Sequence, residues 1–306
     1  KVTNIGKTAG KEVVQAYVCP PQGKLGKPAR NLVGFAKTAL LEPRMSEELK
    51  IEIPYSRFAS YDDSGVTGHK SCFVLESGVY EFYVGSDVRS AKLVGTMQLD
   101  ELQVVEQCGE AVSPTLKFNR MRPQVQQDGT YRMEEEPVPV RSYDLEERIA
   151  ANVPESVPYT GNKGYLLQDV YEEKISLDTF LAQLTDEELI YISRGEGMSS
   201  PKVTPGTAAA FGGVTDELQK YGIPAGCVAD GPSGIRMDCG TKAFSLPNGT
   251  ALACTFNTEL VEQLYEMEGK ELRKNQVDSL LGPGINIHRN PLNGRNFEYF
   301  SEDPFL

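Results

Sequence analysis

The sequence has little of what membrane, metal-binding or nucleic-acid functions require. No apolar run approaches the length needed to cross a bilayer. The two histidines, His69 and His288, are too few and too far apart to suggest a zinc site. The formal net charge of -12 disfavours nucleic acid and anionic membrane surfaces as partners. A neutral substrate such as a sugar fits this composition, and we expect no metal and no cofactor.

Cysteine is also scarce. The six cysteines show no paired spacing for a metal and are too few for a disulfide scaffold: Cys19, Cys72, Cys108, Cys227, Cys239 and Cys254. Several lie in apolar runs, where Cys behaves as a small hydrophobe, so we expect a reducing compartment. This favours the bacterial cytoplasm over secretion. The sequence has no initiator Met and no signal peptide, and it begins and ends abruptly within patterned segments. We therefore expect an internal piece of a longer protein.

The first part of the chain has the pattern of an all-β domain. A chain of 306 residues predicts two domains, and 40% hydrophobic residues is ordinary for a globular protein. Short strands with turns between them are predicted at residues 11–18, 32–37, 48–53, 71–75, 79–84 and 92–99. The turn at residues 76–78 predicts a hairpin between the strands beside it. We therefore expect a β-sandwich over residues 1–106.

Residues 107–175 have the composition of a connector. They hold several prolines and the acidic run at residues 134–136, which predicts a solvated surface. The segment is too long and too mixed for a simple flexible linker. We expect it to be partly ordered.

The remainder of the chain alternates helical and strand patterns. Ser176 and residues 185–188 are predicted to cap two helices, the first of which places Leu177 and Phe180 on one face. The Gly- and Ala-rich stretch that follows matches no nucleotide fingerprint and is interpreted as a mobile segment. Strands are then predicted at residues 226–229, 251–256 and 280–287, with a helix at 259–274 capped by Asn257 or Thr258. These βαβ units predict a parallel sheet.

Polar side chains follow two of these strands. Asp230 ends the first apolar run and is followed at once by Gly231 and Pro232. A carboxylate at this end of a strand is where ligand chemistry is usual in α/β proteins, although Asp230 could instead cap the next helix. The second cluster contains Asn293, Arg295, Asn296, Glu298, Glu302 and Asp303. Both strand ends fit one shared pocket.

Four segments carry a resemblance to a known family. Residues 230–236, 247–253, 282–289 and 294–304 resemble, in the same order, the barrel domain of glycoside hydrolase family 3. The Asn248-Gly-Thr250 glycosylation sequon lies within one of them, so we interpret it as chance.

Residues 2–6, 10–18 and 32–37 resemble the fibronectin-type-III-like domain of the same family, with its first strands missing. A fibronectin-like domain before the barrel resembles the permuted branch of the family. The resemblance implies a sandwich at 1–106, a connector at 107–175 and the first part of a TIM-type (β/α) barrel at 176–306, with about three of eight strands.

The resemblance also implies an activity. It points to a retaining β-glycosidase, most specifically a β-glucosidase that removes terminal non-reducing β-D-glucosyl residues. From the residues alone, Asp230 and Glu298 are candidates for the two carboxyl groups of such an enzyme. The family pattern instead places the nucleophile beyond residue 306 and the acid/base before residue 1, so no catalytic residue is expected in this sequence.

What the resemblance assigns to this chain is the floor of a sugar pocket. Asp230 would accept hydrogen bonds from sugar hydroxyls, Arg295 would donate to the same sugar, and Arg236 would also reach the pocket. Arg295 could instead form only a structural salt bridge to Glu298 or Asp303. Glu298 and His288 are expected to support the site.

Several alternatives stay open. The expected partners are a β-glucoside or short β-linked oligosaccharide and the remaining domains of the same enzyme. A β-xylosidase or an N-acetylglucosaminidase would also fit the family. A non-catalytic carbohydrate-binding or structural module is the alternative of a different class. An Asp in a Ser-Asp-Trp-like strand end beyond Leu306 would decide for the enzyme.

Overall fold

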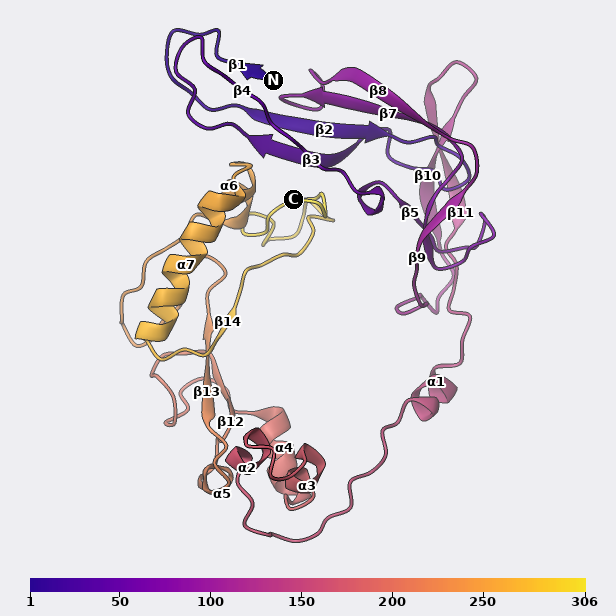
Figure 1. The fold of residues 1–306 in the computed structure, drawn as a ribbon. Coiled ribbons are helices and arrows are strands. Elements are labelled where there is room, and N and C mark those ends of the chain that lie inside the picture. Colours follow the sequence, from indigo (N-terminus) through magenta and orange to yellow (C-terminus); the bar gives the residue numbers. More distant parts are fainter. The chain divides into compact units, whose positions relative to one another are not determined.

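The computed structural model describes residues 1–306 and divides them into two compact units (Figure 1). The first unit comprises Lys1–Ala151 and the second Asn152–Pro304, apart from two terminal residues. No helix in either unit is both long enough and apolar enough to cross a membrane.

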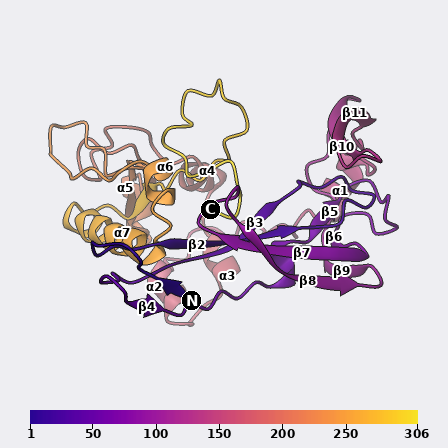
Figure 2. The same ribbon diagram turned by 90° about the horizontal axis from the view of Figure 1, so that it is seen from above.

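The first unit is built on two antiparallel sheets that share one core. One sheet has the order β3-β2-β7-β8, formed by Asn31–Lys37, Val13–Cys19, Gly78–Gly85 and Lys92–Leu99. The other has the order β5-β6-β9, formed by Ser60–Asp62, Cys72–Leu75 and Gln103–Gln107. Val18, Leu75 and Tyr80, from strands of both sheets, meet in the core with Val33 and Phe58. Strands β7 and β8 run side by side over their whole length (Figure 2). The all-β sandwich predicted for this region is confirmed.

One predicted strand of the sandwich is absent. Residues 48–53 form no strand, and only β4 (Ser46–Glu47) pairs with β1 (Val2–Thr3) nearby. The alternating pattern arises because Ile51 and Ile53 are both partly buried against the core. Gly34 leaves room for them, since a Cβ there would lie 2.5 Å from Ile51 Cγ2. Alternation therefore reports one buried face here and not a hydrogen-bonded ladder.

The predicted hairpin at residues 76–78 is also wrong. Strand β6 pairs with β5 and β9, whereas β7 pairs with β2 and β8, so the chain crosses between sheets at this turn. Glu76 anchors the crossing: its buried carboxylate lies 2.5 Å from Lys27 Nζ and accepts the Lys24 N–H at 2.7 Å. These contacts fix the turn to the loop after β2.

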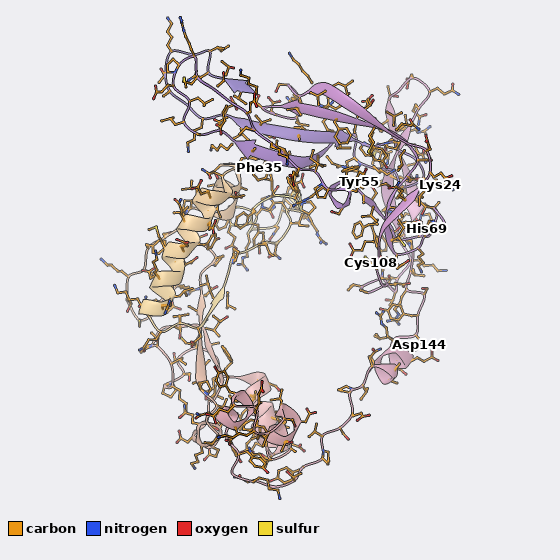
Figure 3. The ribbon with its side chains drawn as sticks, viewed as in Figure 1. Lys24, Phe35, Tyr55, His69, Cys108 and Asp144 are labelled. Atoms are coloured by element: carbon orange, nitrogen blue, oxygen red, sulfur yellow. The ribbon has the colours of Figure 1, made fainter.

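The segment predicted as a connector contains a regular hairpin. Strands β10 (Asn119–Val125) and β11 (Tyr131–Pro137) pair over seven residues each. The acidic run lies within β11, where Glu134 and Glu135 are exposed but Glu136 pairs with Arg120 at 2.6 Å. Arg122 of the same hairpin donates to the carbonyl of Lys24, which is labelled in Figure 3. The unit ends with α1 (Leu145–Ala151).

The second unit begins with short helices whose caps follow the prediction. After α2 (Leu167–Tyr171), Ser176 caps α3 (Leu177–Leu181) by accepting the Thr179 N–H at 3.1 Å. Thr185 and Glu188 form the capping box of α4 (Asp186–Arg194). Phe180 and Leu184 enter a core with residues of α5 (Asp216–Lys220), but Leu177 is 52% exposed and stays outside it.

A three-stranded sheet follows, with the order β12-β13-β14. Strand β12 (Ala209–Gly212), from the Gly- and Ala-rich stretch, is antiparallel to β13 (Ala225–Asp230), and β13 is parallel to β14 (Ser279–Leu281). Helix α7 (Thr258–Lys274), capped by Asn257, lies in the crossover between the parallel strands and confirms the βαβ unit.

Two strand predictions need correction. Residues 251–256 form no strand, because Asn248 accepts the Ala251 N–H at 3.0 Å and starts helix α6 (Gly249–Ala253). The strand predicted at residues 280–287 is only the three residues of β14, and the chain beyond Gly282 forms no ladder.

Candidate functional site

Asp230 is the last residue of β13 and opens a tight loop. Its Oδ1 accepts the Gly231 N–H at 3.0 Å, and its backbone carbonyl accepts the Arg236 N–H at 2.7 Å, which closes the loop of residues 230–236. Gly231 is required there, because its φ is +145° and a Cβ would lie 2.0 Å from the Gly234 carbonyl oxygen. The Asp230 side chain remains 42% exposed and is therefore presented to solvent at the strand end.

The capping alternative for Asp230 is wrong. No helix begins between residues 231 and 248, and the next one, α6, is capped by Asn248. Apart from the Gly231 N–H, the carboxylate has no short contact: Arg236 Nη1 lies 3.8 Å from Oδ2. Most of its accepting capacity is available to a ligand.

The two arginines differ in how they are held. Arg236 is 65% exposed and its Nε lies 3.0 Å from Asp238 Oδ1, so it stays on the surface of the loop. Arg295 donates through Nε to Glu298, whose carboxylate is only 12% exposed. Glu298 is thus the partner, and no ion pair joins Arg295 to Asp303. The hydrogen bond and the charge of Glu298 are the main causes that raise the pKa of Arg295. Tyr299 and Asp230 add smaller contributions in the same direction, so the guanidinium stays charged.

The ion pair with Glu298 leaves the outer edge of Arg295 free. No hydrogen bond engages its two Nη groups, and its Cζ lies 5.6 Å from the centre of the Tyr299 ring. A guanidinium fixed at Nε and open at both Nη atoms can donate to two neighbouring oxygens at once. That is the geometry needed to bind a pair of hydroxyls.

The four segments that suggested a function pack against one another. Gly282 lies against Pro232, since a Cβ on it would be 3.1 Å from the Pro232 Cα. Gly284 lies against the Tyr299 ring, and the Gly249 N–H donates to the Glu298 carbonyl at 3.1 Å. Thr250 Oγ1 adds a 2.6 Å hydrogen bond to the Tyr299 carbonyl. The fold therefore brings the four segments between residues 230 and 304 into one cluster that contains Asp230 and Arg295.

His288 lies behind this cluster. Its backbone N–H donates to the Ser301 carbonyl at 3.1 Å, and its ring centre lies 6.4 Å from that of Tyr299. The Nε2 atom is buried without a hydrogen-bond partner. The contacts agree with a supporting position next to Tyr299, and Glu298 supports Arg295 directly.

Comparison with known proteins identifies the two parts of the chain. The fibronectin type III-like domain family matches residues 12–88, and the glycosyl hydrolase family 3 N-terminal domain matches residues 199–306. A β-glucosidase of Ruminococcus albus is 55% identical over the entire chain. Residues 199–306 are a domain of glycosyl hydrolase family 3. The fibronectin-like domain precedes the family 3 domain, as the permuted order predicts.

Two more relatives are similar to this chain along nearly its whole length. β-Glucosidase A of Butyrivibrio fibrisolvens is 37% identical and covers 100% of the chain. The crystal structure of a β-glucosidase from Paenibacillus barengoltzii is 59% identical, covers 99% of the chain and superposes with a TM-score of 0.94. The chain spans about a third of each relative's own length: 32% and 38% of the two sequences, and 34% of the chain in the crystal.

The shared pocket expected around the two strand ends does not coincide with a deep cavity in the family 3 domain. A cleft of about 850 Å³ lies at the opposite end of β13, between Ala225, Lys202 and Arg273, and includes neither Asp230 nor Arg295. The side chains expected to bind sugar are instead solvent-exposed. The exposed fraction is 42% for Asp230, 65% for Arg236 and 62% for Arg295.

One group behind the site was missed by sequence reasoning. Helix α7 places the buried carboxyl of Glu268 and the half-buried carboxylate of Glu271 on its inner side. Glu271 accepts the Phe244 N–H at 3.3 Å from the segment that follows the Asp230 loop. The available signal was spacing, because Glu268 falls four residues from both Leu264 and Leu272 on the apolar stripe of the helix.

Proposed function

We propose that this chain is part of a retaining β-glucosidase that hydrolyses terminal non-reducing β-D-glucosyl residues. The observation that carries the proposal is the convergence of the four segments on Asp230 and Arg295, with the outer edge of Arg295 open. The relatives that match the whole chain are named β-glucosidases, which supports the same substrate class. The ligand would be a β-glucoside or a short β-linked oligosaccharide.

In this proposal the chain supplies substrate binding and the other parts of the enzyme supply the reacting carboxylates. A retaining glycosidase uses a nucleophile and an acid/base about 5–5.5 Å apart. Asp230 would accept hydrogen bonds from sugar hydroxyls, Arg295 would donate to oxygens of the same ring, and Arg236 would contact the ligand from the loop. Contacts that tighten as the ring distorts toward the transition state would lower the barrier.

The second unit would form the opening of a (β/α) barrel. Its parallel pair β13–β14 with α7 in the crossover is the repeating unit of such a barrel. The domain boundaries proposed are 1–106 for the sandwich, 107–175 for the connector and 176–306 for the barrel segment.

The net charge of -12 argues against nucleic acid and anionic membrane surfaces as partners, and the low cysteine content supports a bacterial cytoplasmic location.

The test is substitution of Asp230 and Arg295 in the full-length protein. A charge-assisted hydrogen bond contributes about 1.5–3 kcal/mol, so Asp230→Asn should lower kcat/KM for an aryl β-glucoside by roughly 10- to 100-fold or more. Arg295→Lys should also be costly, because Lys cannot present two parallel donors. Melting temperatures should stay near that of the unsubstituted protein.

Glu262→Gln is the control, since Glu262 lies at an exposed position of helix α7 and is not one of the proposed sugar-binding residues. It should keep kcat/KM within about threefold. A near-normal kcat/KM for Asp230→Asn, or activity lost only in step with unfolding, would show that Asp230 does not contact the sugar.

A further inference from the structure

Helix α7 contains a carboxyl group that the proposed sugar site does not use. Glu268 is 1% exposed, and neither of its oxygens has a hydrogen-bond partner. The hydroxyl of Tyr265, one turn earlier on the helix, is also buried without a partner. An ionised carboxylate is very costly in such surroundings, because neither water nor a counter-ion compensates its charge.

This group lies directly behind the loop that presents Asp230 and Arg236. The backbone N–H of Gly234 faces the Glu268 carboxyl from that loop, although it does not reach normal hydrogen-bond geometry. The loop is joined to the next segment by the Leu246 N–H, which donates to the Ser233 carbonyl at 2.9 Å. Glu271, one turn after Glu268, accepts the Phe244 N–H of the same segment. The inner side of α7, with Glu268 and Glu271, therefore packs against the loop and the segment that follows it.

Its surroundings in the folded protein favour the protonated form of Glu268. Burial is the main cause that raises its pKa above the ordinary value of 4.5, and the charge of Glu271 adds to it, while the Gly234 N–H acts in the opposite direction. No lysine or arginine forms an ion pair with it. The charged side chains of the loop, Arg236 and Asp238, are exposed and pair with each other.

We propose that uncharged Glu268 is a positioning residue for the loop of residues 230–236, and that its ionisation loosens this loop. The functional part of this inference rests on the proposed sugar-binding role of Asp230 and Arg236. A negative charge at this position would have no cation to pair with, and the structure could lower its energy only by admitting water between α7 and the loop. The loop residues would then be less well held for the ligand.

The sign of the pH dependence follows from the raised pKa. A carboxyl that holds its proton more tightly when folded contributes its full stability below the ordinary value of 4.5, and that stability falls as the pH rises toward the folded pKa. Within this window each pH unit should lower the folding equilibrium constant by up to about tenfold. Asp and Glu side chains held by ion pairs have the opposite dependence.

Melting curves of the full-length protein against pH test the structural part. Glu268→Gln and Glu268→Met both remove the ionisable group, and their melting temperatures should gain on that of the unsubstituted protein as the pH rises. Glu262→Gln, on an exposed position of the same helix, should follow the unsubstituted protein at every pH. The comparison uses the slope against pH, so a uniform loss of stability in one variant leaves the test valid. A pH-independent difference for both variants would overturn the proposal.

Kinetics and hydrogen exchange test the effect on the loop. At each pH the KM of the unsubstituted protein for an aryl β-glucoside is divided by that of Glu268→Gln, and the ratio should rise by about threefold or more across the window. Relative to Glu268→Gln at the same pH, amide exchange at Gly234 and Ile235 in the unsubstituted protein should accelerate across the same window. Faster exchange with a constant KM ratio would retain the loosening but reject the loop's role in sugar binding. Unchanged exchange would overturn the positioning role itself.

Discussion

Asp62 shows how a single buried carboxylate organises a turn of the sandwich. Its side chain is fully buried and accepts six hydrogen bonds from the backbone and hydroxyl groups of Ser64, Gly65, Val66 and Thr67. Burial by itself raises the pKa of Asp62, but these hydrogen bonds outweigh it and hold the pKa below the ordinary value of 3.8. The turn after β5 is therefore folded around a charge.

We expect Asp62→Ala to lower the free energy of unfolding by about 3 kcal/mol, because several buried N–H groups lose their acceptor. Since the pKa is lowered in the folded protein, the stabilisation is present above the ordinary value of 3.8 and lost as the pH falls through the folded value. Denaturant unfolding from pH 7 to pH 2 measures both effects. Asp100→Asn, at an exposed site, is the control. Equal acid sensitivity of Asp62→Ala and the unsubstituted protein would contradict this account.

At the scale of elements, the hairpin β10–β11 is held to the sandwich through charge. Arg120 forms a bidentate ion pair with Asp63, in which its two Nη atoms lie 2.5 and 3.1 Å from the carboxylate oxygens. Its Nε lies 2.6 Å from Glu136 Oε1 on the other strand of the hairpin. The opposite face carries exposed apolar side chains: Met121, Val125, Tyr131 and Met133. The hairpin thus depends on ion pairs for its attachment, although its position in the chain predicted only a connector.

Removal of the Arg120–Asp63 ion pair should loosen the hairpin without unfolding the sandwich. The pairs of Arg120 are partly exposed, so we expect Arg120→Ala to cost about 1 kcal/mol and to raise the rate of proteolysis at the turn of residues 126–130 about fivefold. Arg132→Ala is the matched control, because Arg132 lies on the same hairpin and forms no ion pair. Equal cleavage rates for the two variants would show that the Asp63 contact does not hold the hairpin.

At the scale of the whole molecule, the chain combines a β-sandwich with a second unit of short helices and a three-stranded sheet. The first unit buries its own core between two sheets, whereas the family 3 domain contributes three strands and the loop with Asp230. The relatives are about three times as long as this chain. Under the proposed function, the reacting carboxylates belong to parts of the enzyme outside residues 1–306.

We expect purified residues 1–306 to give no hydrolysis of aryl β-glucosides above a buffer blank, because neither reacting carboxylate is assigned to this chain. The full-length protein at the same molar concentration is the positive control. Turnover by residues 1–306, lost on substitution of Asp230 or Glu298, would instead make these two the carboxyl pair of the reaction.

Some features were determined by local sequence. The caps at Ser176 and Thr185, the helix that becomes α7 and the strand ending at Asp230 were all predicted, because each depends on residues within one or two turns of the chain. The four short segments likewise identified the family, since a motif is a local property. These parts would be recognised in the sequence alone.

Only the tertiary structure decided which segments pair and what is buried. The turn at residues 76–78 could join a hairpin or cross between sheets, and residues 48–53 could lie against a core with or without a ladder, because alternation reports a buried face and not a partner strand. The choice of Glu298 over Asp303 for Arg295, and the burial of Glu268 behind the Asp230 loop, depend on contacts between distant segments. The energy of a charge is set by such neighbours, which the order of residues does not specify.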